Sequence, residues 1–222
     1  MRIFFDALNF TIHAGAFDLR WCRTAAGREA APRQPMLAMC AGHYRPFHAE
    51  AAMTESSLTV VIGFGITGQS VARHLSAQHQ DFAVIDTRPC PVSALPAQGE
   101  YYWESESWPA GLLERAAQVV VSPGLSPQHP LVSFAQTSGL PLCSDIDLFM
   151  TMTEAPVIGV TGTNGKSTVV SLVGHLLNAQ GLACEVGGNL GPPALDLLSQ
   201  HTEVYVLELS SFQLAYSGDL AL

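Results

Sequence analysis

The sequence is poor in positive charge, and this shortage argues against one broad class of function. Ten Lys and Arg residues stand against 19 Asp and Glu, which gives a formal net charge of −9. Proteins that bind nucleic acids through a basic surface need clustered Lys and Arg to neutralise the phosphates. We therefore expect no nucleic-acid partner. Lysine is the scarcest of the charged residues, since Lys166 is the only one in 222 residues.

Long hydrophobic runs and paired cysteines are also missing. No stretch approaches the roughly 20 apolar residues that span a bilayer, and Asp6 interrupts the apolar start of the chain, so we expect neither a membrane partner nor a secretory signal. The five cysteines are odd in number and form no C-x-x-C pair, which argues against a disulfide framework or a zinc ribbon. The sequence thus predicts a cytoplasmic protein, and its 48% hydrophobic content is enough to bury a core.

The first 52 residues differ in composition from the rest of the chain. They hold six Arg and four acidic residues and show neither a period of two nor one of 3.6, so no fold is assigned to them. The four acids and the scarcity of Ser make them a poor match to a transit peptide. We interpret residues 1–52 as an unassigned N-terminal extension ahead of a start at Met53.

From Leu58 onward, β-branched strands alternate with helical stretches, which is the pattern of an α/β fold with open parallel sheets. The alternation begins afresh after residues 145–152, with a second glycine loop. We therefore predict a Rossmann-like domain at 53–147 and a P-loop-type α/β domain at 148–222. Strands are predicted at 58–62, 81–86, 118–122, 140–143, 156–161, 182–186 and 203–209, and helices at 66–79, 109–117, 129–138, 166–180 and 192–200.

The first glycine loop, GFGITG, fits the pattern G-x-G-x-x-G between a strand and a helix, with Asp86 at the end of the next strand. Such a loop lets the backbone approach a diphosphate at a helix N-terminus. An NAD-dependent dehydrogenase fits the motif, and so does a merely structural turn. Arg88 disturbs the NAD interpretation, because an arginine beside the acid prefers a phosphate, although a solvated turn pair gives the same pattern. Ser122 and Gly124 follow another strand and form a second candidate anion site.

The second loop, TGTNGKST, is more specific. A β-branched strand leads directly into it, and an apolar-periodic helix follows. Glycine amides wrap phosphate oxygens, Lys166 reaches the terminal phosphates, and a hydroxyl from Ser167 or Thr168 ligates Mg²⁺. A strict P-loop has glycine where this chain has Val160, so the loop is shorter. Glu208, at the end of a later strand, is placed to hold Mg²⁺ directly or through water.

The segments TGTNGKST, GGNLG and VLELSSFQL, preceded by GFGITG, DTR and VSPG, resemble the Mur ligases of peptidoglycan synthesis. The resemblance covers about residues 57–222, and members that add D-glutamate are the nearest. It implies an ATP- and Mg²⁺-dependent ligase of cell-wall biogenesis. Such an enzyme converts the carboxylate of UDP-N-acetylmuramoyl-L-alanine to an acyl phosphate, which the amine of D-glutamate attacks. We expect a monomer.

The resemblance also assigns roles to individual residues. Lys166 and Glu208 would be catalytic, and Ser167 and Glu208 would hold the metal. The ATP phosphates would lie against Gly162, Thr163, Asn164, Gly165, Lys166, Ser167 and Thr168. The UDP-sugar would contact Gly65, Ile66, Thr67, Asp86, Thr87, Arg88, Ser122, Gly124, Asn189, Ser210 and Gln213.

The match to the family stops inside its central domain, before its C-terminal domain. The second domain is therefore expected to be truncated, the chain to lack ligase activity, and a sheet edge to be left unpaired. Another Mur ligase, a folylpolyglutamate synthetase-like ligase and a non-catalytic UDP-sugar-binding fragment stay open as alternatives, with a dehydrogenase as a distant one.

Overall fold

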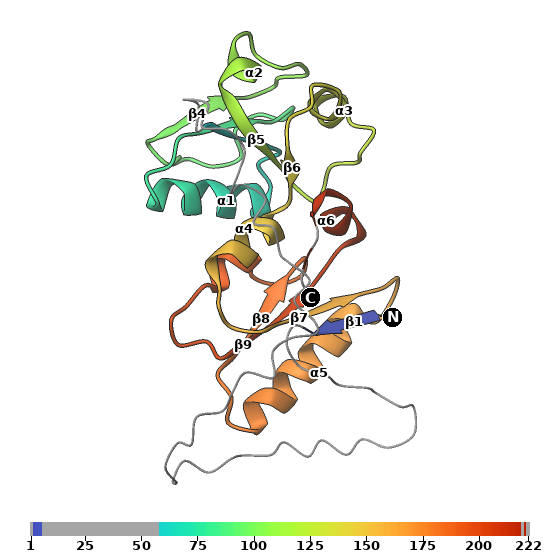
Figure 1. The fold of residues 1–222 in the computed structure, drawn as a ribbon. Coiled ribbons are helices and arrows are strands. Elements are labelled where there is room, and N and C mark those ends of the chain that lie inside the picture. Colours follow the sequence, from blue (N-terminus) through green and yellow to red (C-terminus); the bar gives the residue numbers. More distant parts are fainter. Residues whose placement is uncertain (1, 6–57, 219, 221–222) are drawn as a thin grey trace, which may run out of the picture.

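The computed structural model describes residues 2–5, 58–218 and 220. They form two α/β units, each built on its own sheet, which follow one another along the long axis of the molecule (Figure 1). Apart from residues 2–5, the predicted extension 1–52 lies outside the described residues. The prediction of mixed α/β architecture with parallel sheets is confirmed. Within the described residues, no helix combines the length and the apolar character needed to cross a membrane.

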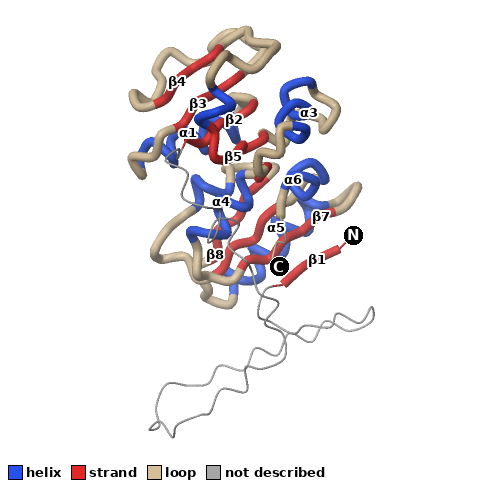
Figure 2. Tube along the Cα trace, turned by 45° about the horizontal axis from the view of Figure 1, so that its top comes forward, coloured by secondary structure: helices blue, strands red, loops and turns tan. Residues whose placement is uncertain are grey.

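The first sheet is entirely parallel and has five strands in the order β4-β3-β2-β5-β6. Helices flank it on both sides (Figure 2). Its strands are β2 (Leu58–Ile62), β3 (Phe82–Ile85), β4 (Gly99–Tyr102), β5 (Ala116–Val121) and β6 (Leu142–Cys143), and its helices are α1 (Ile66–Ala77), α2 (Leu112–Arg115), α3 (Pro130–Thr137) and α4 (Asp145–Met152).

The second sheet has the order β1-β7-β9-β8, in which β7, β9 and β8 run parallel and β1 runs antiparallel to β7. The strand β1 was not predicted, and it occupies one edge of this sheet while β8 forms the other. The elements are β1 (Arg2–Phe5), β7 (Val157–Thr161), α5 (Lys166–Ala179), β8 (Cys184–Gly188), the 3-10 helix η1 (Ala194–Leu197), β9 (Val204–Glu208) and α6 (Ser211–Tyr216).

The local structure differs from the predictions in several places. The helix predicted at 109–117 shrinks to α2, because Ala116 enters the parallel pairing with β2. The helix predicted at 192–200 is only a 3-10 turn, since Leu198 is already non-helical. The short edge strand β4 and the helices α4 and α6 were missed. The domain boundary stays a prediction: it was placed near residues 145–152, between 147 and 148, and this stretch forms α4, whose first turn is stabilised by the capping box of Ser144 and Asp147.

Alternation along the strands divides the buried side chains into three clusters. One face of the first sheet packs on α3, and one face of the second sheet packs on α5. The remaining faces share a single cluster with α1, α4 and η1, which contains Val61 and Phe82 from the first sheet and Tyr205 and Leu207 from the second. Because this cluster is continuous, hydrophobic burial holds the two sheets together.

Candidate functional site

A cavity of about 600 Å³ opens at the carboxyl ends of β2, β3 and β5, where open parallel sheets bind ligands. Asn189, which follows β8 in the second sheet, also lines it, so both sheets contribute to its wall. Nine residues predicted to contact a ligand line this first pocket: Gly65, Ile66, Thr67, Asp86, Thr87, Arg88, Ser122, Gly124 and Asn189. Seven further residues complete the lining and were not predicted as ligand contacts, although Gly63 and Pro123 belong to the motifs GFGITG and VSPG: Ile62, Gly63, Ile85, Pro123, Leu125, His129 and Leu131.

Two glycines of the first loop have different roles. A Cβ atom added at Gly68 would collide with the carbonyl oxygen of Gly63, so only glycine lets α1 pack this closely against the loop. A Cβ at Gly65 would meet no atom within 4 Å, and Gly65 lines the pocket. The open space above Gly65 is therefore where a ligand can approach the backbone at the start of α1.

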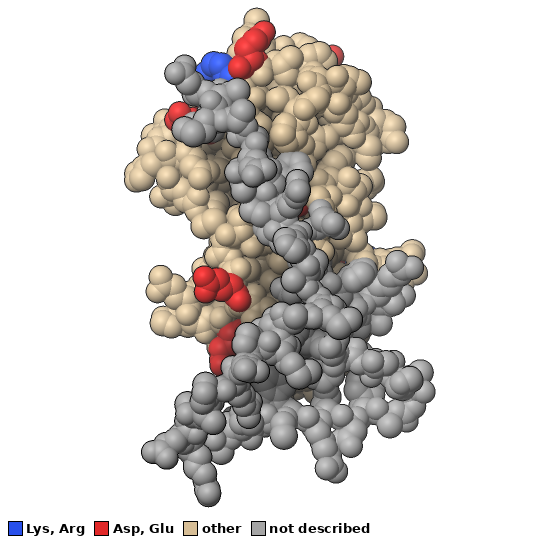
Figure 3. All heavy atoms as spheres, viewed as in Figure 1, with Lys and Arg blue, Asp and Glu red and all other residues tan. Residues whose placement is uncertain are grey.

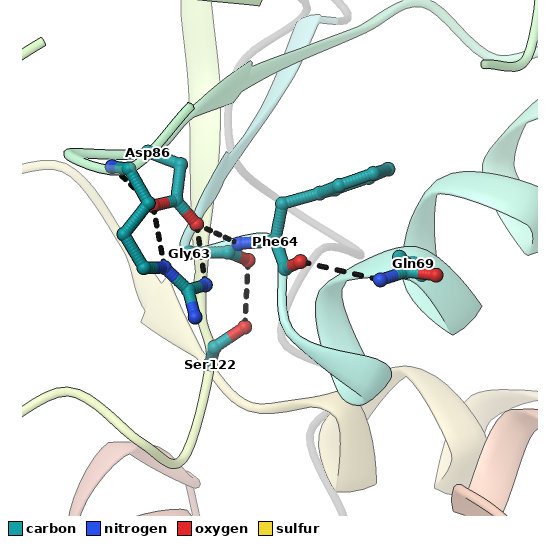
Figure 4. A network of polar contacts seen from close by, with 6 residues as sticks. Gly63, Phe64, Gln69, Asp86 and Ser122 are labelled. Atoms are coloured by element: carbon teal, nitrogen blue, oxygen red, sulfur yellow. Dashed lines mark hydrogen bonds and ion pairs between the residues drawn. The ribbon is translucent and has the colours of Figure 1, made fainter. Parts of the chain in front are cut away.

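The carboxylate of Asp86 is buried and holds the first loop in place (Figure 4). Its Oδ2 accepts the backbone N–H of Phe64 at 2.6 Å. Arg88 donates its backbone N–H and Nε to Oδ1, at 2.8 and 2.9 Å, and its Nη2 to Oδ2 at 2.7 Å. Burial by itself would raise the pKa of Asp86, but these hydrogen bonds outweigh it and the pKa is lowered.

These contacts bear on the NAD interpretation of the loop. A carboxylate offers about four acceptor positions, and the backbone of Phe64 and three donors of Arg88 fill that number. In this arrangement Asp86 has no acceptor position left for a ribose hydroxyl. The acid at the end of β3 thus anchors the loop and orients Arg88, whose side chain is 62% exposed beside the pocket.

Ser122 closes the other side of the pocket and is also engaged with the loop. Its Oγ donates to the carbonyl oxygen of Gly63 at 2.8 Å, and its backbone N–H donates to Ile62 at 3.0 Å. Ser122 as a whole residue is 7% exposed. Ser122 therefore couples the end of β5 to the first loop, while Gly124 lies further out along the same wall.

The second loop turns between β7 and α5. Gly165 has a φ of +76°, which favours glycine, and it stands immediately before Lys166, the first residue of α5. The Nζ of Lys166 donates to the carbonyl oxygen of Gly162 at 2.8 Å, so the ammonium group folds back over the loop. Thr163, Asn164 and Gly165 are exposed. The chain's only ammonium side chain thus lies at a strand-to-helix corner with exposed residues around it.

Glu208 meets this loop at the carboxyl end of β9. Its Oε2 accepts the hydroxyl of Ser167 at 2.7 Å, and its Oε1 accepts the side-chain amide of Asn189 at 3.3 Å. Glu208 as a whole residue is 4% exposed, and both of these partners are neutral. A buried charge is costly without a counter-charge, and an oxygen pair of this kind suits a hard cation such as Mg²⁺. The described residues contain no cluster of three His, Cys, Asp or Glu, so such an ion would need oxygens from a bound phosphate or water.

Ser210 and Gln213 were predicted to face the substrate, but their side chains form hydrogen bonds within the protein. They form the capping box of α6, in which each side chain bonds to the other residue's backbone N–H. Gln213 is buried, and its Nε2 also donates to Oδ1 of Asp145 at 2.9 Å. Neither residue lines the first pocket. Asp145 is fully buried with no partner at Oδ2, and burial raises its pKa to about 6.

Few charged side chains are visible on one face of the molecule (Figure 3). On the face drawn in Figure 3, charged side chains of the described residues are few and scattered. The exposed ion pair of Arg115 with Glu100 lies at the outer edge of the first sheet, away from the residues that line the first pocket. If anions bind at the two loops, backbone amides and helix termini would have to provide much of the positive potential there.

These observations define an α/β protein with two glycine loops, each at the carboxyl edge of its own sheet. Residues 57–144 match the model of the Mur ligase MurD-like N-terminal domain, and residues 160–221 match that of the Mur ligase middle domain. The chain belongs to the Mur ligase family.

Named relatives agree with this assignment. The chain is 45% identical to the UDP-N-acetylmuramoylalanine–D-glutamate ligase of Vibrio vulnificus over 165 residues, which are 73% of this chain and 37% of the relative. It is 46% identical to the ligase of the same name from Vibrio campbellii over 167 residues, 73% of this chain and 38% of the relative. The chain thus spans less than two fifths of the length of these relatives.

Among solved structures, the UDP-N-acetylmuramate:L-alanyl-gamma-D-glutamyl-meso-diaminopimelate ligase of Neisseria meningitides is similar. It shares 23% identity, covers 69% of this chain and 52% of its own, and has a TM-score of 0.43.

Proposed function

We propose that this chain provides the UDP-sugar site and part of the ATP site of a ligase that joins D-glutamate to UDP-N-acetylmuramoyl-L-alanine. One observation carries the proposal. Two glycine loops face the carboxyl edges of adjacent sheets, and Asn189 belongs to both sites, since it lines the first pocket and donates to Glu208. A UDP-sugar and the phosphates of ATP would thereby meet at one junction. The names of the relatives support the choice of substrates.

The proposal gives each half of the chain a task. Residues 53–147 form the UDP-sugar domain, in which the amides at the start of α1 receive the diphosphate and Arg88, held by Asp86, supplies positive charge. Residues 148–222 would form part of the ATP domain. ATP with Mg²⁺ would supply the phosphoryl group that activates the substrate carboxylate. Lys166 would neutralise the phosphates, and Ser167 and Glu208 would hold the metal.

The structure weighs against the dehydrogenase alternative, because the acid at the end of β3 has no free acceptor position for a ribose. A ligase of the same family with a different amino-acid substrate would keep both loops. No contact in the described residues favours it over the D-glutamate ligase.

Calorimetry on the full chain tests the proposal. We expect binding of UDP-N-acetylmuramoyl-L-alanine and of UDP, and no binding of NADH. Arg88→Ala should weaken UDP binding, because Arg88 lines the pocket. Arg73→Ala should not weaken it, because Arg73 lies on α1 outside the pocket lining and pairs with Asp196 of η1. Binding of NADH without binding of UDP would overturn the proposed function.

A further inference from the structure

The helix α6 belongs to the second sheet by sequence, but its last residue is buried in the first half of the molecule. Tyr216 is 4% exposed and packs in the cluster that contains Leu131, Val132 and Ala135 of α3. Figures 1 and 2 both show α6 beside α3, between the two sheets. The second half thus inserts an aromatic side chain into the core of the first.

The hydroxyl of Tyr216 reaches the wall of the first pocket. It donates to the carbonyl oxygen of Leu125 at 2.8 Å. Leu125 ends the segment Ser122–Leu125, and every residue of that segment lines the pocket. Ser122 fixes the near end of the segment to Gly63, and a turn bond joins the backbone N–H of Leu125 to Ser122. The bond from Tyr216 fixes the far end.

The helix that carries Tyr216 is itself fixed at its start. Its N-cap, Ser210, lies two residues after Glu208, and the backbone N–H of Leu209 donates to Val160 of β7. Gln213 bonds to Asp145 at the start of α4. A helix of six residues with both ends bonded has little freedom to shift, so the position of Leu125 is tied to the second sheet.

We propose that Tyr216 is a positioning residue for the first pocket: its hydroxyl sets the Ser122–Leu125 wall in the geometry that binds a nucleoside diphosphate. The proposal rests on the proposed function, which makes UDP the ligand of this pocket. Under this proposal, the second half contributes to UDP affinity through a residue that does not touch the ligand.

The test compares two hydroxyl deletions in the full chain. Tyr216→Phe keeps the buried ring and removes only the donor to Leu125. Tyr101→Phe is the matched control, because its hydroxyl also donates to a backbone carbonyl, that of Pro96 at 2.9 Å, but away from the pocket. One lost hydrogen bond should weaken UDP binding about 3- to 10-fold in Tyr216→Phe and leave it unchanged in Tyr101→Phe.

Hydrogen exchange without ligand gives a second readout. Amides in a peptide covering residues 122–129 should exchange faster in Tyr216→Phe than in the wild type or in Tyr101→Phe. UDP affinity within twofold of the wild type, or unchanged exchange in this peptide, would overturn the positioning role. If the wild type does not bind UDP, the proposed function fails, while the exchange measurement still decides whether Tyr216 holds the wall.

Discussion

Replacing Asp86 by Asn is expected to loosen the first loop and destabilise the fold around it. The carboxylate accepts four hydrogen bonds, from the backbone of Phe64 and from three donors of Arg88. Asn offers one oxygen, and its NH₂ group would face donors of the same kind. At most two of the four bonds can therefore persist, and a buried polar group is left unpaired.

The size of the expected stability loss depends on how exposed each hydrogen-bond partner of Asp86 is. A hydrogen bond to a charged group contributes about 1.5–3 kcal/mol when its partner is removed. The bond to Phe64 is buried and counts fully, whereas the side chain of Arg88 is 62% exposed and its contribution is screened by solvent. We expect Asp86→Asn to lower the free energy of unfolding by about 2–3 kcal/mol, which corresponds to a Tm lower by about 4–12 °C for a chain of this size.

The same contacts predict how the effect depends on pH. The pKa of Asp86 is lowered in the folded state from its ordinary value of 3.8. Its contribution to stability is therefore fully present above pH 3.8 and is lost as the pH falls through the folded-state pKa. The difference between wild type and variant should be constant near neutral pH and should shrink in acid.

Thermal and urea unfolding followed by circular dichroism measure this difference. Glu100→Gln is the control, because Glu100 forms a similar two-bond contact with Arg115, at 2.6 and 2.7 Å, but with 41% and 49% exposure of the two side chains. It should lose less stability. The reasoning is refuted if Asp86→Asn is as stable as Glu100→Gln at pH 7, or if its deficit stays the same below pH 3.

Four further variants test the two loops and the helix junction. Gly68→Ala should destabilise the protein because its Cβ would collide with backbone, whereas Gly65→Ala should keep the wild-type Tm and weaken UDP binding; equal Tm losses would contradict this. Lys166→Ala should weaken binding of Mg²⁺-ATP in calorimetry and leave UDP affinity unchanged, and an unaltered ATP affinity would contradict the phosphate role. Wild-type stability should fall as the pH rises from about 4 to about 6, because the folded-state pKa of Asp145 is raised by burial. Asp145→Asn should remove this dependence and be the more stable protein at pH 8 in urea titrations; a retained slope would exclude Asp145 as its cause.

Much of the fold could be predicted because its signals are local. The strand β2 was predicted with its bounds, since a β-branched run ends at glycine. The helix α5 was predicted within one residue, because apolar periodicity follows a glycine loop. The strand β4 was missed because its four residues are half-buried at a sheet edge and show no apolar alternation. The strand β1 has no local signal at all, since its pairing with β7 joins residues about 155 positions apart.

The sequence by itself predicts where phosphates would bind, because glycines, a lone lysine and a strand-end carboxylate encode that chemistry within short segments. Only the tertiary structure decided what each side chain does there. It turned Asp86 from a candidate ligand contact into the anchor of Phe64 and Arg88. It also brought Tyr216 to the pocket wall at Leu125, which lies 91 positions earlier in the chain. Hydrophobic burial between the sheets brings together side chains that no sequence period relates.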